Sequence, residues 1–363
     1  MSVNAAVVQS DIRRYETVDL DLPDDLGDAW GVLAVEVNAL CGTDFEWYCG
    51  AVERDKLPLP YVPGHEPIGQ IEWVSPEAVA AGWREGTRVA VASHLPCGRC
   101  RHCQAGRPQF CLAAFGYGRT RLSVGHGLWG GFAQRLVLRP GTILHQVPDG
   151  LTALDASFYN SLSAGIAWID AVGVGNGDRV LVLGAGQRGL AAVIAAKQRG
   201  ASTVIITGRS SDADRLEIAQ SLGADRTIVV DREDTVRTVS DLTEGEMVER
   251  VLDLTPLATQ PVLDGLACAG RGAVVGLAGL KGVHLLDGLA VDPIIQRGLT
   301  IRGLRPPSRA AREEALALLA RREHPFGLLA AMTVGLDGAE RGVRIIGNEI
   351  SRPAGIVQIV VVP

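Results

Sequence analysis

Short apolar runs alternate with helical segments over the second half of the chain. Six runs have the length and β-rich composition of buried strands: RVLVL (179–183), STVIITG (202–208), RTIVV (226–230), RVLDL (250–254), GAVVGLAG (272–279) and LTIRG (299–303). Helical patterns such as LAAVIAAKQRG (190–200) and TQPVLDGLACAG (259–270) lie between them. This alternation predicts a doubly wound α/β domain built on a parallel sheet, which we place at residues 152–298.

The flanking segments have a different pattern. Residues 1–151 show short β-rich runs, many Gly and Pro residues and few helix signals, which predicts a separate β-rich domain. The last segment, 299–363, ends in AGIVQIVVVP. We expect this tail to be an extended strand that returns to the first domain.

Length and charge exclude several classes of protein. A chain of 363 residues is too long for one ordinary core, which favours two domains. The net charge of −6 and the lack of a long basic run argue against a surface for nucleic acid or anionic membranes. Charged residues interrupt every apolar stretch, so we expect no membrane span. The N-terminus lacks a signal-peptide pattern, and we expect a cytoplasmic protein without disulfides.

Four cysteines fall within fifteen residues of one polar loop: Cys97, Cys100, Cys103 and Cys111. Steps of C-x-x-C are too short for an easy disulfide framework, but each small turn can direct two sulfurs inward. Zn²⁺ takes four thiolates in a tetrahedron, and such a closed site is structural rather than catalytic. The alternatives are four reduced surface cysteines or a four-iron cluster.

Two segments upstream carry a more varied set of donors. ALCGTDFEWY contains Cys41, Thr43 and Asp44, and VPGHEPIGQI contains His65 and Glu66. A thiolate, an imidazole and a carboxylate suit an open zinc site. Asp44 could orient His65 and fix its tautomer, and the Thr43 hydroxyl could pass a proton. Taken alone, a Cys before Gly such as Cys41 is usually structural, and a His after Gly such as His65 is usually a turn residue.

A glycine-rich turn follows the strand at 179–183. Gly184, Gly186 and Gly189 form G-x-G-x-x-G, with Gln187 and Arg188 inside the motif, and a helical segment follows. In a Gly-rich chain the motif alone is a weak signal. Strand, glycine turn and helix together are the context of a dinucleotide fingerprint, in which a pyrophosphate lies at the helix N-terminus.

The end of the next strand predicts which coenzyme is bound. A NAD site usually has Asp or Glu there, whereas this chain has Gly208 followed by Arg209 and Ser210, with Arg215 in the next helix. Arginine and serine would hydrogen-bond a 2′-phosphate, so we expect NADP(H) to be preferred over NAD(H). The alternative is that Arg209 is only a solvated loop charge.

These motifs, in this order and spacing, resemble the zinc-dependent medium-chain dehydrogenase/reductase family of alcohol, threonine and polyol dehydrogenases. The similarity includes CGTD, GHEPIG, the CGRCRHC…C lobe, GGFAQRLVL, the glycine turn and LTIRG, and it runs from end to end. It implies an N-terminal domain with a GroES-like β-barrel core that carries two zinc ions per chain. It also implies a Rossmann coenzyme domain, an active site in the cleft between the domains, and a homodimer or homotetramer.

The resemblance also assigns roles to residues. Cys41 and His65 match the catalytic zinc ligands, Glu66 the adjacent carboxylate that binds the metal in some members, and Thr43 the hydroxyl that takes the substrate's proton. The four cysteines of the lobe match the structural zinc site. His94 lies at a place that resembles threonine dehydrogenases, where it would touch substrate, although a loop histidine is the alternative.

Two positions depart from the family pattern. Where the family has a further Cys, Asp or Glu ligand, this chain has Asn160, which could bind through its carbonyl, hold a water, or leave Glu66 to complete the shell. Where many members have a relaying His, it has Glu46, whose ordinary pKa is about 4.3 rather than about 6.5. The proton relay beyond Thr43 is therefore open.

Together these features predict a zinc-dependent oxidoreductase that transfers a hydride between NADP(H) and a small alcohol or carbonyl substrate. A secondary alcohol, a sugar or polyol, or a ring hydroxyl would all fit. Two alternatives stay open: a quinone or enoyl reductase of the zinc-free type, and a degenerate NADP(H)-binding sensor.

Overall fold

The computed structural model describes residues 2–51 and 57–363, and the chain divides into two compact units. The first unit combines residues up to 158 with residues 330–363, and the second contains residues 159–329. The sequence boundaries at 151 and 298 differ from this division. The difference arises mainly because residues 299–329 contain a strand that pairs with the sheet of the second unit and a helix that packs on another helix of that unit.

The second unit is built on a six-stranded parallel sheet with the order β12-β11-β10-β13-β14-β15. Its strands are β10 (Arg179–Leu183), β11 (Thr203–Gly208), β12 (Arg226–Val229), β13 (Val248–Asp253), β14 (Ala269–Leu277) and β15 (Thr300–Gly303). All six lie at or within a few residues of the predicted runs. The strand order reverses between β10 and β13, and in open α/β sheets ligands bind outside the carboxyl ends of the strands at such a point.

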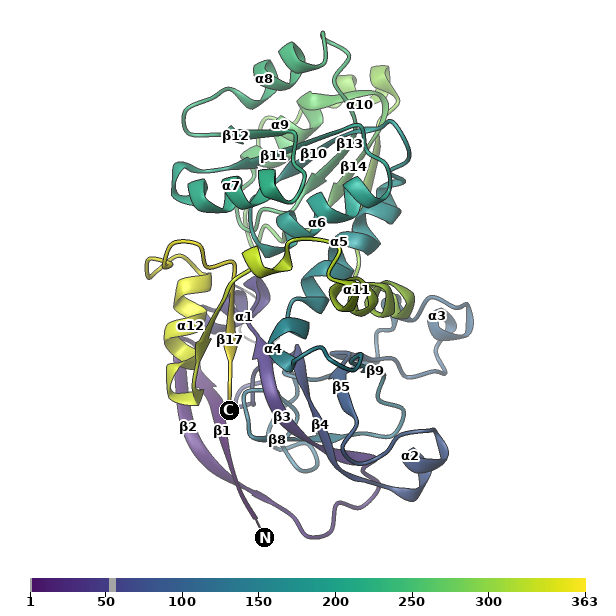
Figure 1. Ribbon diagram of the computed structural model, residues 1–363, viewed down its shortest axis with the longest axis vertical. Helices are drawn as coiled ribbons and strands as arrows, with labels where there is room; N and C mark the ends of the chain where they lie inside the picture. Colours follow the sequence, from purple (N-terminus) through teal and green to yellow (C-terminus); the bar gives the residue numbers. More distant parts are fainter. Residues whose placement is uncertain (1, 52–56) are drawn as a thin grey trace. The chain divides into compact units, whose positions relative to one another are not determined.

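Helices cover both faces of this sheet. On one face α6 (Gln187–Gln198) packs against α5 (Tyr159–Val172) and α7 (Ala213–Ser221), and α11 (Arg309–Arg321) packs on α5 (Figure 1). Two further helices, α8 (Thr235–Leu242) and α9 (Gln260–Cys268), pack together, and α10 (Asp292–Arg297) contacts β14. Val180–Leu183 and Leu190–Ala196 are almost completely buried, as expected for a sheet covered on both faces.

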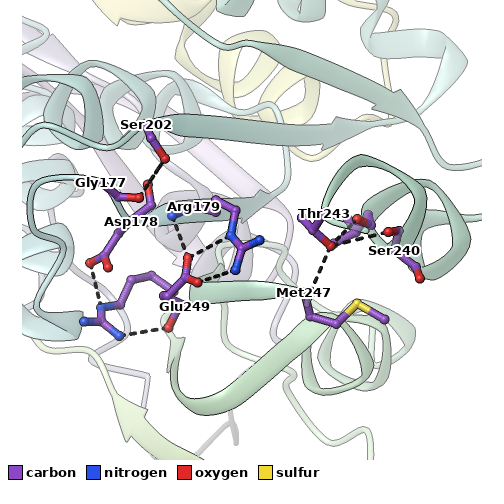
Figure 2. A network of polar contacts seen from close by, with 10 residues as sticks. Gly177, Asp178, Arg179, Ser202, Ser240, Thr243, Met247 and Glu249 are labelled. Atoms are coloured by element: carbon purple, nitrogen blue, oxygen red, sulfur yellow. Dashed lines mark hydrogen bonds and ion pairs between the residues drawn. The ribbon is translucent and has the colours of Figure 1, made fainter. Parts of the chain in front are cut away.

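Ion pairs and hydrogen bonds join neighbouring strands at the amino ends of β10 and β13. The Arg179 guanidinium donates to both carboxylate oxygens of Glu249, at 3.2 and 2.5 Å, and the Arg179 backbone N–H donates to the same group at 2.8 Å. Figure 2 shows this pair beside the hydrogen bond from Ser202 to the carbonyl of Gly177. The same view shows Thr243 accepting from the backbone N–H of Met247, which closes the loop after α8.

The first unit contains a seven-stranded sheet with the order β16-β17-β3-β4-β5-β9, in which β8 also pairs with β3. Its strands are β3 (Gly31–Ala39), β4 (Pro67–Val74), β5 (Arg88–Val91), β8 (Arg135–Leu138), β9 (Leu144–Gln146), β16 (Ala331–Val334) and β17 (Gln358–Val361). Two ribbons accompany it: β1 (Ser2–Asp11) with β2 (Arg14–Leu22), and β6 (His94–Leu95) with β7 (Phe115–Gly116). Its helices are α1 (Gly42–Tyr48), α2 (Pro76–Ala80), α3 (Arg101–Gln104), α4 (Ala153–Ala156) and α12 (Ala339–Ile346).

The C-terminal tail returns to the first unit, as its sequence predicts. Val360 and Val361 of β17 pair antiparallel with Ala39 and Asn38 of β3. The whole of β17 is buried, so the last strand is part of the core of this unit. Among the described residues, no helix has the length and apolarity needed to span a membrane.

Candidate metal and coenzyme sites

The four cysteines of the loop at 97–111 converge. One sulfur from each of Cys97, Cys100, Cys103 and Cys111 lies within 4.8 Å of the others. Gly98 and Gly106 both have φ of +70°, which L side chains rarely adopt, so the two turns of the loop require glycine. Backbone amides of Arg99 and Cys100 lower the pKa of the Cys97 thiol to about 6. Four sulfurs at this spacing fit the donor set of a structural zinc ion and leave no position for substrate.

A second cluster lies in the interior of the first unit. The Cys41 sulfur is 3.1 Å from Nε2 of His65, although 24 residues separate them in the chain. On the other side of the ring, Nδ1 of His65 lies 3.1 Å from a carboxylate oxygen of Asp44. The two ring nitrogens face in opposite directions, so a metal on the Cys41 side would be bound by Nε2 while Asp44 orients the ring from behind.

Asp44 also organises the Cys41 end of helix α1. Cys41 is the residue that precedes the helix, and its backbone N–H donates to the second oxygen of Asp44 at 2.9 Å. One buried carboxylate therefore fixes both the cysteine backbone and the histidine ring. Burial disfavours the charged form of His65, but the Asp44 carboxylate and the Cys41 thiolate outweigh it and raise the pKa of His65 well above its usual value. The two acidic neighbours thus favour positive charge on the imidazole.

Glycines bring two distant segments together around His65. A Cβ on Gly64, which has φ of +88°, would lie 2.7 Å from the backbone nitrogen of Phe132. A Cβ on Gly130 would lie 2.0 Å from the carbonyl oxygen of Val62. Backbone hydrogen bonds from Gly131 and Phe132 to the carbonyls of Gly64 and Pro63 close this contact. The glycines of the GHEPIG and GGF motifs therefore serve the close approach of two backbones.

Glu66 adds a carboxylate near the same imidazole nitrogen. Its side chain is 2% exposed, and one oxygen lies 3.8 Å from Nε2 of His65. The backbone N–H of Glu66 donates to the buried Asn38 amide at 3.1 Å, which fixes the direction of this segment. Asn160 belongs to the second unit, in the first turn of α5, and its role as a ligand stays a prediction.

The remaining catalytic candidates lie in different surroundings. Thr43 is half-buried in the first turn of α1, two residues from Cys41, and Glu46 is buried on the same helix. His94 lies on β6, and its Nε2 is 3.3 Å from the carbonyl oxygen of Pro108 in the cysteine lobe. The roles of Thr43, Glu46 and His94 stay predictions.

The glycine turn after β10 has the geometry that a dinucleotide requires. Gly184 has φ of +107°, and a Cβ on Gly189 would lie 1.9 Å from the Gly184 carbonyl oxygen. By contrast, a Cβ on Gly186 would meet no atom within 4 Å, so an open space lies over the first turn of α6. A pyrophosphate could approach the backbone there. Gln187 and Arg188 begin that helix, and the Arg188 guanidinium lies 5.5 Å from the centre of the Trp168 ring.

The end of β11 combines the predicted arginines with two carboxylates that the sequence analysis overlooked. Arg215 is nearly buried and pairs with Asp212, whose other oxygen accepts the backbone N–H of Arg209. Hydrogen bonds from Ser210 lower the pKa of Asp231 at the end of β12. Nε of Arg215 is buried with no acceptor among the described residues, whereas the Arg209 side chain is exposed. Gly208 places no side chain at this point.

The structure adds a second group that no motif indicated. The buried carboxylate of Asp253, at the end of β13, lies 2.6 Å from Nζ of Lys281 and accepts from the Thr255 hydroxyl at 2.5 Å. Lys281 also donates to the Thr255 carbonyl at 2.6 Å. A Cβ on Gly184 would lie 3.0 Å from the Thr255 side chain. This cluster therefore forms one wall of the glycine turn at the switch point of the sheet.

Two family models match the chain. Residues 27–149 match the alcohol dehydrogenase GroES-like domain, and residues 189–321 match the zinc-binding dehydrogenase domain. The probable alcohol dehydrogenase of Mycobacterium tuberculosis (strain H37Rv) is 35% identical over 346 residues, which is 93% of each chain. The chain belongs to the zinc-type medium-chain dehydrogenase/reductase family. It is an oxidoreductase of the alcohol dehydrogenase type, which acts on CH–OH groups.

Other relatives agree with this assignment. The L-threonine 3-dehydrogenase of Marinomonas sp. is 32% identical over 282 residues, or 75% of this chain and 76% of the relative. The solved alcohol dehydrogenase of Thermus sp. ATN1 is 26% identical, with a TM-score of 0.81 over 99% of both chains. A zinc-binding dehydrogenase of Sinorhizobium meliloti bound to NADP has a TM-score of 0.86 over 100% of both chains at 24% identity, which shows the fold. The predicted fold, a GroES-like domain with a Rossmann domain, is confirmed.

Proposed function

We propose that this protein is a zinc- and NADP(H)-dependent dehydrogenase that interconverts a secondary alcohol, sugar, polyol or ring hydroxyl with its carbonyl compound. The observation that carries the proposal is the arrangement of Cys41, His65 and Asp44, in which sulfur and Nε2 converge while the carboxylate holds Nδ1. The glycine turn at Gly184–Gly189, with open space at Gly186, supplies a place for the coenzyme.

Each residue near Cys41 has a separate task in this proposal. Cys41 and His65 would hold zinc, with Glu66 or Asn160 completing the ligand set. A zinc ion bound there would polarise the substrate oxygen, and a bound nicotinamide would exchange the hydride. The Thr43 hydroxyl takes the proton of the alcohol. Asp44 keeps the His65 ring in the tautomer that leaves Nε2 as a donor to the metal.

The preference for NADP(H) rests on the end of β11. Gly208 carries no carboxylate that would repel a 2′-phosphate, the exposed Arg209 can reach such a group, and the buried Nε of Arg215 lacks an acceptor among the described residues. Asp212 is already engaged by Arg215 and by the Arg209 backbone, so its charge is partly compensated. We expect kcat/KM to be at least about tenfold higher with NADP⁺ than with NAD⁺.

A coenzyme test uses one arginine at the site and one elsewhere. Arg209→Ala should raise KM for NADP⁺ and leave KM for NAD⁺ within about twofold, because NAD⁺ lacks the phosphate that the guanidinium binds. Arg237→Ala, on the exposed face of α8, is the matched control. If Arg209→Ala raised KM for NADP⁺ and for NAD⁺ equally, the proposed role of Arg209 in the preference for NADP(H) would be contradicted.

Zinc content and turnover test the reaction itself. The wild-type chain, purified without chelator, should contain two zinc ions, and Cys41→Ser should contain one. The wild type with two zinc ions should reduce simple ketones with NADPH, and the Cys41→Ser variant with one should not. One zinc in the wild type, together with reduction of activated double bonds, would favour the zinc-free reductase instead. One zinc and coenzyme binding without turnover would favour a sensor.

An exposed sheet edge supports a homo-oligomer, either a homodimer or a homotetramer. Strand β15 ends the sheet of the second unit, and all four of its residues are exposed. Val283, Leu285 and Ile295 lie nearby in sequence, between β14 and β15, with exposed fractions of 82%, 81% and 71%. An open sheet edge, together with exposed apolar side chains in the segment that leads to it, favours pairing with a second copy. Light scattering should give twice or four times the chain mass, and Ile301→Lys should reduce it.

A further inference from the structure

Arg119 lies in a tight turn that follows strand β7. The turn is held by a 2.6 Å hydrogen bond from the Gly118 N–H to the Trp129 carbonyl and by a 2.9 Å hydrogen bond from the Thr120 hydroxyl to Gly116. No motif in the sequence pointed to this arginine. Its position within the first unit is therefore a contribution of the tertiary structure.

This turn lies directly against the segment that carries His65. Gly118 has φ of +68°, and a Cβ there would lie 2.5 Å from the Gly64 carbonyl oxygen and 3.0 Å from Cβ of His65. The Arg119 side chain folds back over the turn. Its Nε would lie 2.7 Å from a Cβ on Gly116, so this placement of the side chain requires glycine there. Both glycines thus allow the turn to pack against the His65 segment with the Arg119 side chain folded over it.

The Arg119 guanidinium has few charged neighbours among the described residues. Arg119 is half-buried, and no described residue forms an ion pair or a side-chain hydrogen bond with it. Burial lowers the pKa of Arg119, and the Cys41 thiolate is the one charged group found to oppose that shift among the described residues. This effect of Cys41 on Arg119 agrees with the packing of the turn against His65.

Metal binding would change this balance. If zinc were held by Cys41, His65 and Glu66, it would offset the negative charges of its ligands, and among the described residues no carboxylate pairs with Arg119. A half-buried cation without a counter-charge is costly, and an arginine fork pairs with a planar carboxylate through two hydrogen bonds. A phosphate dianion fits less well, since one cation would leave part of its charge uncompensated.

We propose that Arg119 binds a carboxylate group of the substrate, so that the enzyme acts on hydroxy acids and oxo acids rather than on neutral alcohols. The inference rests on the proposed dehydrogenase function and adds the class of substrate to it. Arg119 then contributes selectivity by holding the carboxylate beside the carbon that exchanges the hydride.

Binding to a matched pair of ligands tests this assignment without turnover. Acetoacetate and methyl acetoacetate share the reacting carbonyl and differ in the carboxylate, and with oxidised NADP⁺ neither can be reduced. Calorimetry on the zinc-loaded chain with saturating NADP⁺ should show that acetoacetate binds about tenfold or more tightly than the ester. In Arg119→Met this difference should disappear, and in Arg119→Lys it should return in part.

The control is Arg121→Met, which removes an exposed arginine two residues along the same loop and should leave both affinities unchanged. Wild-type protein that binds acid and ester equally would overturn the proposal. So would an Arg119→Met variant that weakens both ligands equally or loses zinc, because either result assigns Arg119 to support of the Cys41 cluster. Binding of inorganic phosphate that depends on Arg119, without acetoacetate binding, would overturn the carboxylate assignment.

Kinetics with NADPH separate this proposal from the reaction on which it rests. If the ester is reduced and the acid is not, the dehydrogenase function stands and the role of Arg119 fails. If acetoacetate binds through Arg119 but neither ligand is reduced, the carboxylate site stands and the proposed reaction fails for these compounds. If both are reduced, kcat/KM for acetoacetate should fall about 100-fold in Arg119→Met, and that for the ester should stay within about threefold.

Discussion

The two sulfur-containing clusters of the first unit are built in opposite ways. The lobe at Cys97–Cys111 takes four identical donors from fifteen consecutive residues, in a loop whose side chains are largely exposed. The cluster at Cys41 takes sulfur and nitrogen from segments 24 residues apart and buries them behind Asp44. A closed set of like donors can be made by local turns alone, whereas an asymmetric set needs a folded core to hold it.

The difference separates stability from reactivity. Four thiolates fill a tetrahedron, so a metal in the lobe can only cross-link the loop. Cys41 and His65 supply two donors, and the neighbouring acid or amide completes a weaker and more open set. We therefore expect changes at the two clusters to affect different measurements.

The largest effect is expected at Cys41. Cys41→Ser removes the thiolate from the buried cluster, and kcat/KM should fall at least about 1,000-fold, as expected when a catalytic metal is lost. The unfolding midpoint should change little, because Asp44 already holds both the Cys41 backbone and the His65 ring without help from this sulfur. Cys49→Ser, at the other end of the same helix, is the control and should retain activity. A fully active Cys41→Ser enzyme would falsify the mechanism.

An intermediate effect is expected at Asp44. Asp44→Asn keeps the shape of the side chain but removes the charge that holds Nδ1 of His65, so zinc affinity and kcat/KM should each fall about 10–100-fold. Metal titration followed by assay of the reloaded enzyme checks both values. Asp241→Asn, whose side chain is exposed on α8, should change neither. If Asp44→Asn lowers the unfolding midpoint and leaves zinc affinity unchanged, Asp44 acts only as a helix cap.

The smallest effect on activity is expected in the lobe. Cys100→Ser should reduce zinc content from two ions to one and lower the unfolding midpoint, by about 2–4 °C for each kcal/mol of stability lost. Activity of the folded protein should stay within about threefold. Gln104→Ala, exposed on the same short helix, is the control. Loss of catalysis without loss of stability would remove the distinction between the two clusters.

Much of the fold could be predicted from local patterns. Strand β10 coincides with the run RVLVL, and the other five strands of its sheet lie at or within a few residues of their predicted runs, because buried parallel strands are continuous and apolar. The glycine turn was predictable for the same reason, since Gly184 and Gly189 occupy conformations or spaces that other residues cannot. Strand β15 was predicted, but as an exposed edge strand it gave no signal to extend the domain boundary beyond it.

The environment of each site was less predictable. The sequence indicated Cys41, His65 and Asp44 as one group, and the observed distances agree with that grouping. It did not indicate Arg119, because a lone arginine after a glycine has no periodic or spacing signal. Likewise, Asp212 and Asp231 come near Arg209 and Ser210 through loops after two different strands. Contacts of this kind depend on how the loops cross, which local patterns do not encode.

The sequence by itself determined the elements, the two groups of metal donors and the dinucleotide turn, since hydrophobic periodicity, glycine conformation and donor chemistry are properties of short segments. The tertiary structure decided which ring nitrogen of His65 faces Cys41, which carboxylate lies behind it, and which arginine of the turn against His65 lacks a partner among the described residues. The physical reason is that orientation, burial and charge compensation are sums over neighbours from distant parts of the chain. Folding alone brings those neighbours within a few ångströms of one another.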